Sequence, residues 1–464
     1  MAERDLTYGP LAPHLIAMAV PASLGMLFTT LYNLVDTYYA GWISTDAQAG
    51  LALSFTVFML LMSVGFGLSQ GASALIGSAL GAKDQGNARD YAAGAITTAA
   101  ILGVVLAIIG ILGSEPLLRQ MGTTPEVLAA SVDYLDVFFL GMPSFLVSFT
   151  ANGVLSSQGD TNTNKQAQMV AFFANIGLNP LLIYGAFGVS GLGFNGIALS
   201  TVLIQTGAAV FMVRRAIATR AMQGSGFANY VPSLRVIADF IRQGAPASLT
   251  MAVMMVGGFI IQVHLQPFGA AAVAGFGVAF RVEQLILLPI LAISFALMPL
   301  VSQNFGARNF DRVRQAVTLA VTVGLGLALF GAIALALGGV ALTRFFTEDP
   351  DAIVSGAAYL RVAALMMPAY TAMFMVTALF QGIKRPIWSV VIGAYRQLFA
   401  LILFPMLFVT VFGWGLAGVW AGLFVAVWSG FALAIILTVL VTRNAIGGMR
   451  PDFRAVRRAV GDNG

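Results

Sequence analysis

The sequence predicts an all-α integral membrane protein with twelve transmembrane helices in two six-helix bundles. Its 464 residues are 59% hydrophobic and only 9% charged, with a mean hydropathy of +0.88. Soluble domains carry about a quarter charged residues. Apolar runs recur from end to end, and each can supply the roughly 20 residues that a membrane-crossing helix needs. Two halves of the chain also share short motifs, and no stretch is left over for a soluble domain.

Apolar length, Gly and Pro punctuation and charge clusters place the helices in chain order. The predicted ranges are 14–40, 50–80, 92–113, 131–156, 166–188, 196–219, 245–267, 272–301, 317–342, 359–383, 387–411 and 417–441. Polar or Gly- and Pro-containing segments separate them, among them "GWISTDAQAG", "GAKDQGNAR", "GSEPLLRQMGTTPE", "SSQGDTNTNK", "GLGFNG", "GARNFDRVR", "TRFFTEDPD" and "QGIKRP".

These helices divide into two lobes. We expect an N-lobe at 1–221 with helices one to six, a cytoplasmic linker at 222–242, a C-lobe at 243–445 and a basic cytoplasmic tail at 446–464. "QGSG" and "VPSLR" mark the linker.

Lys and Arg predict the orientation. With the N-terminus inside, the cytoplasmic segments collect 19 of the 24 basic residues, which favours an even number of helices and two cytoplasmic termini. We therefore expect a multi-pass protein of the cell inner membrane. The tail "RPDFRAVRRAV" is more suited to anionic membrane lipid than to nucleic acid.

The internal repeat explains the two halves. "PASL" at 21–24 returns at 246–249, and "GAKDQGNAR" at 81–89 answers "GARNFDRVR" at 306–314, both at a shift of 225 residues. Six helices per half is an even number, so the halves form parallel repeats related by a pseudo-two-fold axis along the membrane normal. A central cavity between the halves is the natural expectation.

Two carboxylates, Asp36 and Glu283, lie deep inside predicted helices, where a charged group is costly and commonly functional. Tyr32 shares the helical face of Asp36, and a bend near Pro21 could move that face. Polar residues on three further first-half helices could join Asp36 in one cluster: Asn152, Asn175, Asn179 and Thr201.

The chemistry of this cluster leaves alternatives open. Asp36 could exchange a proton, because desolvation disfavours its charged form. Its oxygens, with amide and hydroxyl oxygens, could instead coordinate sodium. It could also simply hydrogen-bond a neighbouring helix and fix packing.

A possible second site lies in the other half, around Glu283, Arg281, Gln262 and His264. Glu283 could bind a cation or substrate, or could form an ion pair with Arg396. Arg281 and Glu283 point in different directions on a helix, and His264 is near a helix end. With no cysteine and two histidines, we expect no cofactor and no thiolate or histidine-rich metal site.

The whole chain resembles the multidrug and toxic compound extrusion (MATE) family. The resemblance rests on "PASLGMLFTTLYNLVDTYYAG", "SQGASALIGSALGAKD", "GVLSSQGDTN", "NIGLNP" and "FALMPLVSQNFGARN", and the aspartate with Tyr32 and Pro21 is similar to the DinF-like branch. It implies a V-shaped, non-enzymatic transporter that expels organic, often cationic or aromatic, compounds in exchange for protons or sodium. It also implies that Asp36 is the coupling-ion site, aided by Asn152, Asn175 and Thr201.

The chain departs from that pattern at Asn179. Several relatives have a second aspartate there, whereas asparagine cannot lose a proton. Asp36 is therefore expected to be the only carboxylate of the first-half site.

Three other classes of function are alternatives to ion-coupled efflux. A flippase or exporter of a lipid-linked precursor or specific metabolite shares this plan, but a flippase would need a more basic central cavity. An intramembrane enzyme would need a nucleophile and base within reach, and the two buried carboxylates lie in opposite halves. A passive channel is disfavoured, because no ring of polar residues repeats in both halves. We expect a monomer whose partners are small organic substrates and membrane lipids.

Overall fold

The structure is a computed structural model that describes residues 4–120, 124–186 and 189–449. The chain forms two compact units. One unit contains Pro21–Ser248, and the other contains Leu6–Val20 together with Leu249–Gly464. The start of the first helix therefore belongs to the second unit, whereas the predicted N-lobe at 1–221 included it. Most of the predicted basic tail at 446–464 lies outside the described residues.

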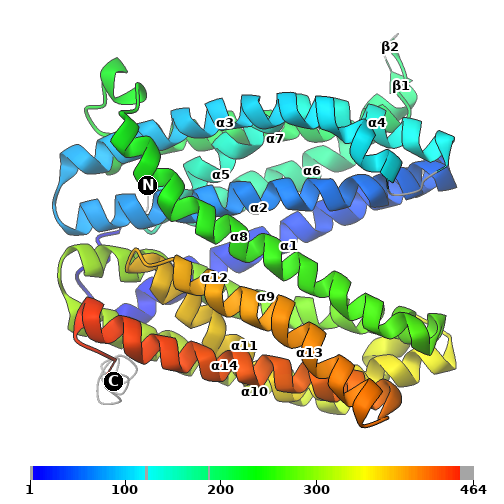
Figure 1. Ribbon diagram of the computed structural model, residues 1–464. Helices are drawn as coiled ribbons and strands as arrows, with labels where there is room; N and C mark the ends of the chain where they lie inside the picture. Colours follow the sequence, from blue (N-terminus) through cyan, green and yellow to red (C-terminus); the bar gives the residue numbers. More distant parts are fainter. Residues whose placement is uncertain (1–3, 121–123, 187–188, 450–464) are drawn as a thin grey trace. The chain divides into compact units, whose positions relative to one another are not determined.

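Long helices make up nearly all of both units (Figure 1). The first unit contains most of α1 (Leu11–Ile43), α2 (Thr45–Gly81), α3 (Gln85–Gln120), α4 (Pro125–Leu140), α5 (Met142–Ser156), α6 (Asn162–Tyr184) and α7 (Phe194–Ile217). The second contains most of α8 (Leu234–Leu265), then α9 (Ala270–Gly306), α10 (Phe310–Arg344), α11 (Pro350–Gly382), α12 (Ile387–Ala394), α13 (Leu401–Met406) and α14 (Gly415–Ile446).

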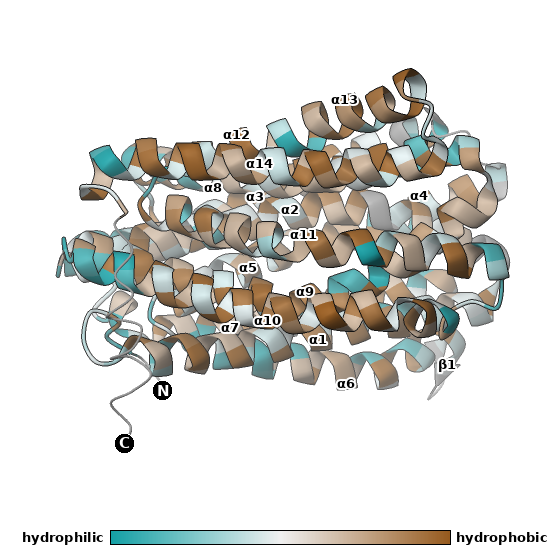
Figure 2. Ribbon diagram, turned by 90° about the horizontal axis from the view of Figure 1, so that it is seen from below, coloured by the Kyte–Doolittle hydropathy of each residue, from teal (hydrophilic) through white to brown (hydrophobic). Residues whose placement is uncertain are grey.

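The prediction of an all-α membrane protein is confirmed. Within the described residues, 11 helices are long and apolar enough to cross a membrane, and the bent pair α4 and α5 meets the same criteria together, which gives up to twelve spans. Hydrophobic residues dominate the helices (Figure 2). Closed helical hydrogen bonding suits such segments, because a bilayer core offers no water to unpaired backbone groups.

Short elements complete the described chain. Two-residue strands β1 (Gly185–Ala186) and β2 (Val189–Ser190) pair antiparallel between α6 and α7. Short 3₁₀ segments η1 (Arg220–Met222), η2 (Phe227–Tyr230) and η3 (Gln266–Phe268) precede or follow α8, and π-helical turns η4 (Tyr395–Ala400) and η5 (Leu407–Val411) interrupt the span that begins with α12.

Several predicted ranges differ from the structure at their ends, and two differences change the description of the fold. The predicted helix 131–156 is two helices, α4 and α5, that meet at Gly141 with a bend of 52°. Pro143 stands in the first turn of α5, where it lacks the N–H that would continue the hydrogen bonding of α4. The predicted linker at 222–242 is helical from Leu234, because α8 begins 11 residues before the expected start at 245.

Close helix packing explains why small residues are frequent in the first unit. A Cβ atom at Gly103 of α3 would lie 2.4 Å from the Cα of Pro143 on α5, so the two backbones approach too closely for any side chain. Aromatic side chains fill the adjoining core, where the rings of Phe138 and Phe145 have centroids 4.8 Å apart and Phe58 contacts Phe138 at 5.1 Å.

The internal repeat is visible in four helix ends. Backbone hydrogen bonds of the Schellman type close α2, α5, α9 and α11, from Asp84 to Ala79, Asp160 to Leu155, Asn309 to Asn304 and Arg385 to Phe380. The residue in the left-handed conformation is Lys83, Gly159, Arg308 or Lys384, with φ of 59°, 78°, 56° and 58°. These positions fall in pairs separated by the same 225 residues as the sequence motifs.

The segments before α1 and after α14 both bind the first turns of α10. Arg312 donates hydrogen bonds to the carbonyls of Tyr8, at 2.9 Å, and Gly9, at 2.7 Å. Arg314 donates to the carbonyl of Gly448 at 2.8 Å. The segment before α1 at Tyr8 and Gly9 and the segment after α14 at Gly448 therefore lie at the same end of the second unit.

Candidate functional site

Asp36 lies on the buried stripe of α1. Tyr32, Asp36 and Ala40 are four residues apart, and their exposed fractions are 5%, 7% and 0%. Residues at this spacing stack on one helical face. The helix α1 continues through Pro21, and it places the Asp36 carboxylate in the interior of the first unit.

Two asparagines of α6 hold the carboxylate. The Asn175 and Asn179 side-chain amides donate to Asp36 Oδ1 at 2.8 and 2.9 Å. Asn179 also donates to the Asn175 side-chain oxygen at 3.3 Å, and both asparagines are fully buried. Their spacing of four residues places both amides on the side of α6 that meets α1.

Hydroxyl groups contact the other carboxylate oxygen. Thr201 Oγ1, on α7, donates to Asp36 Oδ2 at 3.5 Å, which is a long contact. The Tyr32 hydroxyl in turn donates to Thr201 Oγ1 at 3.0 Å. Three helices, α1, α6 and α7, therefore bring together Asp36, Tyr32, Asn175, Asn179 and Thr201, which is the predicted cluster without Asn152.

The electrostatics of this cluster favour binding of a positive charge. The described hydrogen-bond partners of Asp36 are all neutral, so its negative charge has no basic counterpart among them. Among the described residues, Asp36 Oδ2 has the long Thr201 contact alone, and the buried Asn179 Oδ1 has no hydrogen-bond partner there. A proton or a hard cation at these oxygens would relieve the cost of a buried charge.

Two of the predicted residues take other places. Asn152 is half-buried and its side-chain oxygen accepts a hydrogen bond from Ser156 at 3.5 Å, and the described contacts do not join it to Asp36. Pro21 is the residue at which α1 passes from the second compact unit to the first.

Tyr134 is a residue that the sequence reasoning missed. It is buried on α4, stacks on Phe194 with ring centroids 5.0 Å apart, and lies within electrostatic range of Asp36. A single tyrosine in the apolar run "YLDVFFL" carries no periodic signal, so only the tertiary structure shows that it faces the cluster.

The second-half residues do not come together as predicted. Glu283 of α9 is buried, and it accepts a hydrogen bond from the Tyr359 hydroxyl of α11. Arg281 and Gln262 are exposed, and His264 is half-buried near the backbone of Leu401. Glu283 is therefore separate from the other three residues in its described contacts.

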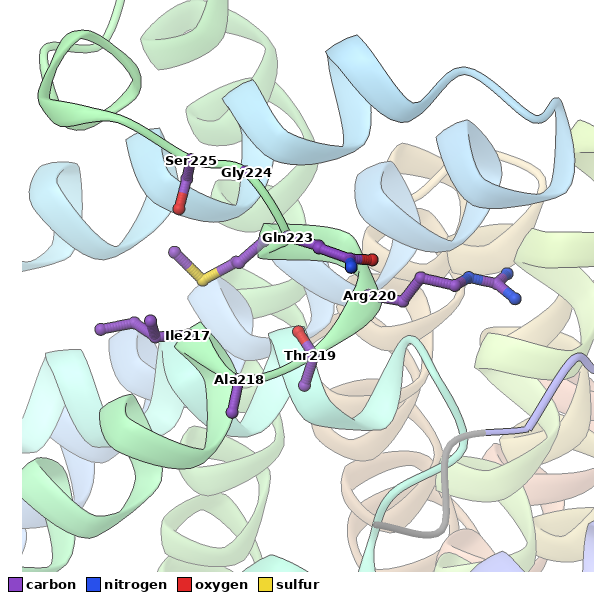
Figure 3. Close-up of a pocket in the computed structure, with 8 residues that line it drawn as sticks. Ile217, Ala218, Thr219, Arg220, Gln223, Gly224 and Ser225 are labelled. Carbon is purple, nitrogen blue, oxygen red and sulfur yellow. The ribbon is translucent and has the colours of Figure 1, made fainter.

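A pocket of about 540 Å³ lies along the segment that follows α7. Its lining consists of residues 217–220 and 222–225, which follow one another along a single loop (Figure 3). It includes no residue of the Asp36 cluster. Because one loop and its own backbone make most of this surface, we place the candidate site at Asp36 instead.

Comparisons with known proteins agree with the duplicated architecture. The family model described as MatE matches residues 21–181 and again 246–406. YoeA of Bacillus subtilis, a probable multidrug resistance protein, is 30% identical over 308 residues, which span 65% of this chain and 66% of that protein. An FAD transporter of Shewanella oneidensis is 26% identical over 407 residues, or 86% of this chain and 88% of that protein.

A solved structure matches nearly the whole chain. It is the outward-facing conformation of a multidrug resistance MATE family transporter of the MOP superfamily, with a TM-score of 0.86 and 26% identity. The alignment covers 96% of this chain and 98% of that one. With both halves matched by the family model, the chain belongs to the MatE family of membrane transporters, which are not enzymes.

Proposed function

We propose that this protein is a secondary active efflux transporter that exchanges a proton or a sodium ion for organic, often cationic or aromatic, compounds. The observation that carries the proposal is the buried Asp36 carboxylate, held by Asn175 and Asn179 with only neutral described partners. The multidrug resistance relatives support the substrate class. The similarity of this cluster to the DinF-like branch is part of the same proposal.

Linkage explains how such a site can drive efflux. An ion that enters from outside binds Asp36 and stabilises the state that has released substrate, and release of the ion inside restores the substrate-binding state. Ion and substrate then weaken each other's binding by the same factor. Tyr32, Thr201 and the two asparagines position the carboxylate throughout the cycle.

We further propose a monomer in the cell inner membrane, in contact with lipid, with both termini in the cytoplasm. Support for a shared side comes from Arg312 and Arg314 in the first turns of α10, which bind the segments before α1 and after α14. The basic residues of the loops support the cytoplasmic assignment of that side.

Everted membrane vesicles test the coupling. Efflux of a cationic dye is measured with the proton gradient and the sodium gradient imposed separately. Asp36→Asn should abolish gradient-driven efflux and leave the amount of folded protein unchanged. Asp133→Asn, an exposed aspartate on α4, is the matched control and should transport normally. Gradient-dependent efflux by Asp36→Asn at the wild-type rate would refute the mechanism.

A second candidate is export of one specific metabolite. The observation that favours it is the FAD transporter of Shewanella oneidensis, which aligns over most of both chains. Competition in the same vesicles separates the two functions. Inhibition of dye efflux by FAD, with transport of FAD itself, would favour the specific exporter.

A further inference from the structure

We propose that Glu283 is a second proton-binding carboxyl of this protein, held in the second unit by Tyr359 and Arg396 and independent of Asp36. The proposal does not require Asp36 to couple transport. Glu283, Tyr359 and Arg396 all belong to the second unit, whereas Asp36 and its described partners belong to the first.

One of the two carboxyl oxygens of Glu283 has a described hydrogen-bond partner, and the other has none. Its residue is 1% exposed, and one oxygen, Oε2, accepts a hydrogen bond from the Tyr359 hydroxyl. The other oxygen, Oε1, is buried and has no described hydrogen-bond partner. A charged oxygen without a partner is costly in a low-dielectric interior, because it has lost its hydration without replacement. A proton on Oε1 removes the charge and leaves the Tyr359 bond to Oε2 intact.

Aromatic rings pack around Tyr359, the residue that donates to this carboxyl. Phe276 of α9 meets the Tyr359 ring edge-on with centroids 5.0 Å apart, and Trp420 of α14 lies 5.3 Å from the same ring. Tyr359 and Trp420 are 1% and 5% exposed. These rings exclude water from the acid and keep the local dielectric low, which favours its neutral form.

Arg396 supplies the nearby positive charge without closing an ion pair. It acts electrostatically on Glu283, but the described residues show no direct ion pair between the two side chains. Its guanidinium lies 5.1 Å from the centre of the Tyr370 ring instead. Gly430 of α14 receives its methylene stem, since a Cβ there would lie 3.1 Å from Arg396 Cβ. The arginine is thus positioned as a counter-charge for the ionised acid.

The backbone at Arg396 is suited to a local change. Arg396 is the second residue of the π-helical turn η4, and single π turns inside α-helices are frequent at functional sites. A π turn contains one residue more than an α turn, so a small register change there would alter the distance from Arg396 to Glu283.

Protons fit this site better than metal ions. A hard cation needs several oxygen ligands, whereas Glu283 Oε1 is the unpartnered oxygen that this carboxyl offers, and the Arg396 charge repels a cation. The titratable or charged groups that act on Glu283 are Tyr359 and Tyr370 of α11 and Arg396 of η4. Trp420 of α14 is neutral, and α10 faces this part of α9 with Gly331, next to Ile286. An ordinary tyrosine ionises at about pH 10, so Glu283, and not Tyr359 or Tyr370, is the proton-exchanging group of this set.

Infrared pH-difference spectroscopy of the purified full-length protein tests the proposal without any transport. In the Asp36→Asn background, a carboxylic-acid C=O band should titrate separately from exposed carboxyl groups, which titrate at about pH 4. Adding Glu283→Gln should remove the band. Adding Glu115→Gln, an exposed acid paired with Arg119, should leave it unchanged. Retention of the band in the Glu283→Gln protein would overturn the proposal.

Further variants separate a proton site from a structural acid. Tyr359→Phe keeps the ring but removes the hydrogen bond, so the C=O band should persist at a shifted frequency. This variant tests the assignment of the band to Glu283 also when the Glu283→Gln protein does not fold. Arg396→Gln should let the protonated form persist to higher pH, and Arg396→Lys should not. Loss of the band when sodium replaces choline would identify a cation site and contradict the proton assignment. Coupled efflux that depends on Asp36 is measured independently, so either proposal can fail alone.

Discussion

Replacing Asn179 by aspartate would put a second carboxylate beside Asp36. In the structure the Asn179 amide nitrogen lies 2.9 Å from Asp36 Oδ1 and donates to it. The introduced aspartate in its ionised form would offer no donor. Because each charge spreads over two oxygens, the charge centres would be about 4 Å apart, and at an effective dielectric constant near 20 the repulsion is about 4 kcal/mol.

That repulsion fixes the size of the expected effect. One pH unit corresponds to about 1.4 kcal/mol, so full repulsion would displace proton binding by about 3 pH units. Asn175 and Thr201 remain as donors and side chains relax, which reduces the effect to about 1–3 pH units. The two acids would share one proton, and the pH dependence of efflux should move to the alkaline side while transport continues.

The assay is dye efflux from everted vesicles over a range of pH, with sodium present or replaced by choline. If sodium is the coupling ion, the added oxygen should lower the sodium concentration needed for half-maximal efflux instead. Asn164→Asp in the first turn of the same helix is the matched control and should keep the wild-type profile. An active Asn179→Asp protein with unchanged pH and sodium dependence would refute the placement of Asn179 beside the coupling ion.

Three further predictions concern stability and the chain end. Lys83→Gly should raise the free energy of unfolding by about 1 kcal/mol, because glycine adopts the left-handed conformation without steric cost, and an unchanged thermal midpoint would contradict this. Gly153→Ala should lower it by about 1–3 kcal/mol, since the new Cβ would lie 2.3 Å from a carbonyl oxygen of α2. Gly177→Ala in α6, whose new Cβ meets nothing within 4 Å, should unfold at the wild-type temperature or above it, because alanine favours the helix over glycine. Arg312→Ala should speed limited proteolysis before α1, because three carbonyls there lose a donor, and equal cleavage rates would exclude that role.

The number and order of the spans could be predicted from hydropathy, but their ends and irregularities could not. Hydropathy detects the apolar part of a helix, whereas α11 begins at Pro350, where Asp349 caps the polar first turn, and not at 359. The bend at Gly141 was missed because the apolar pattern continues through it. The π turn at Tyr395–Ala400 changes the backbone hydrogen bonding without changing composition, so no sequence pattern marks it.

The candidate site could be predicted where its residues share a helical spacing. Asn175 and Asn179 are four apart on one helix, and this spacing identified them as partners of one acid. Tyr134 and Tyr359 contact or face their carboxylates from separate helices, and a lone tyrosine in an apolar run carries no comparable signal. Asn152 has the right chemistry and the wrong neighbour, because its contact is within its own helix.

The left-handed basic residues at three of the four matched helix ends have a consequence for membrane insertion. Lys83, Arg308 and Lys384 occupy positions where glycine would fold at lower cost, as Gly159 does at the fourth. During synthesis, however, positive charge beside an emerging span decides which side of the membrane the loop stays on. A glycine at these positions would raise the free energy of unfolding, but it would remove a positive charge that orients the neighbouring span. Basic residues at these loops therefore lower the stability of the folded state slightly and strengthen the signal that orients the neighbouring spans during membrane insertion.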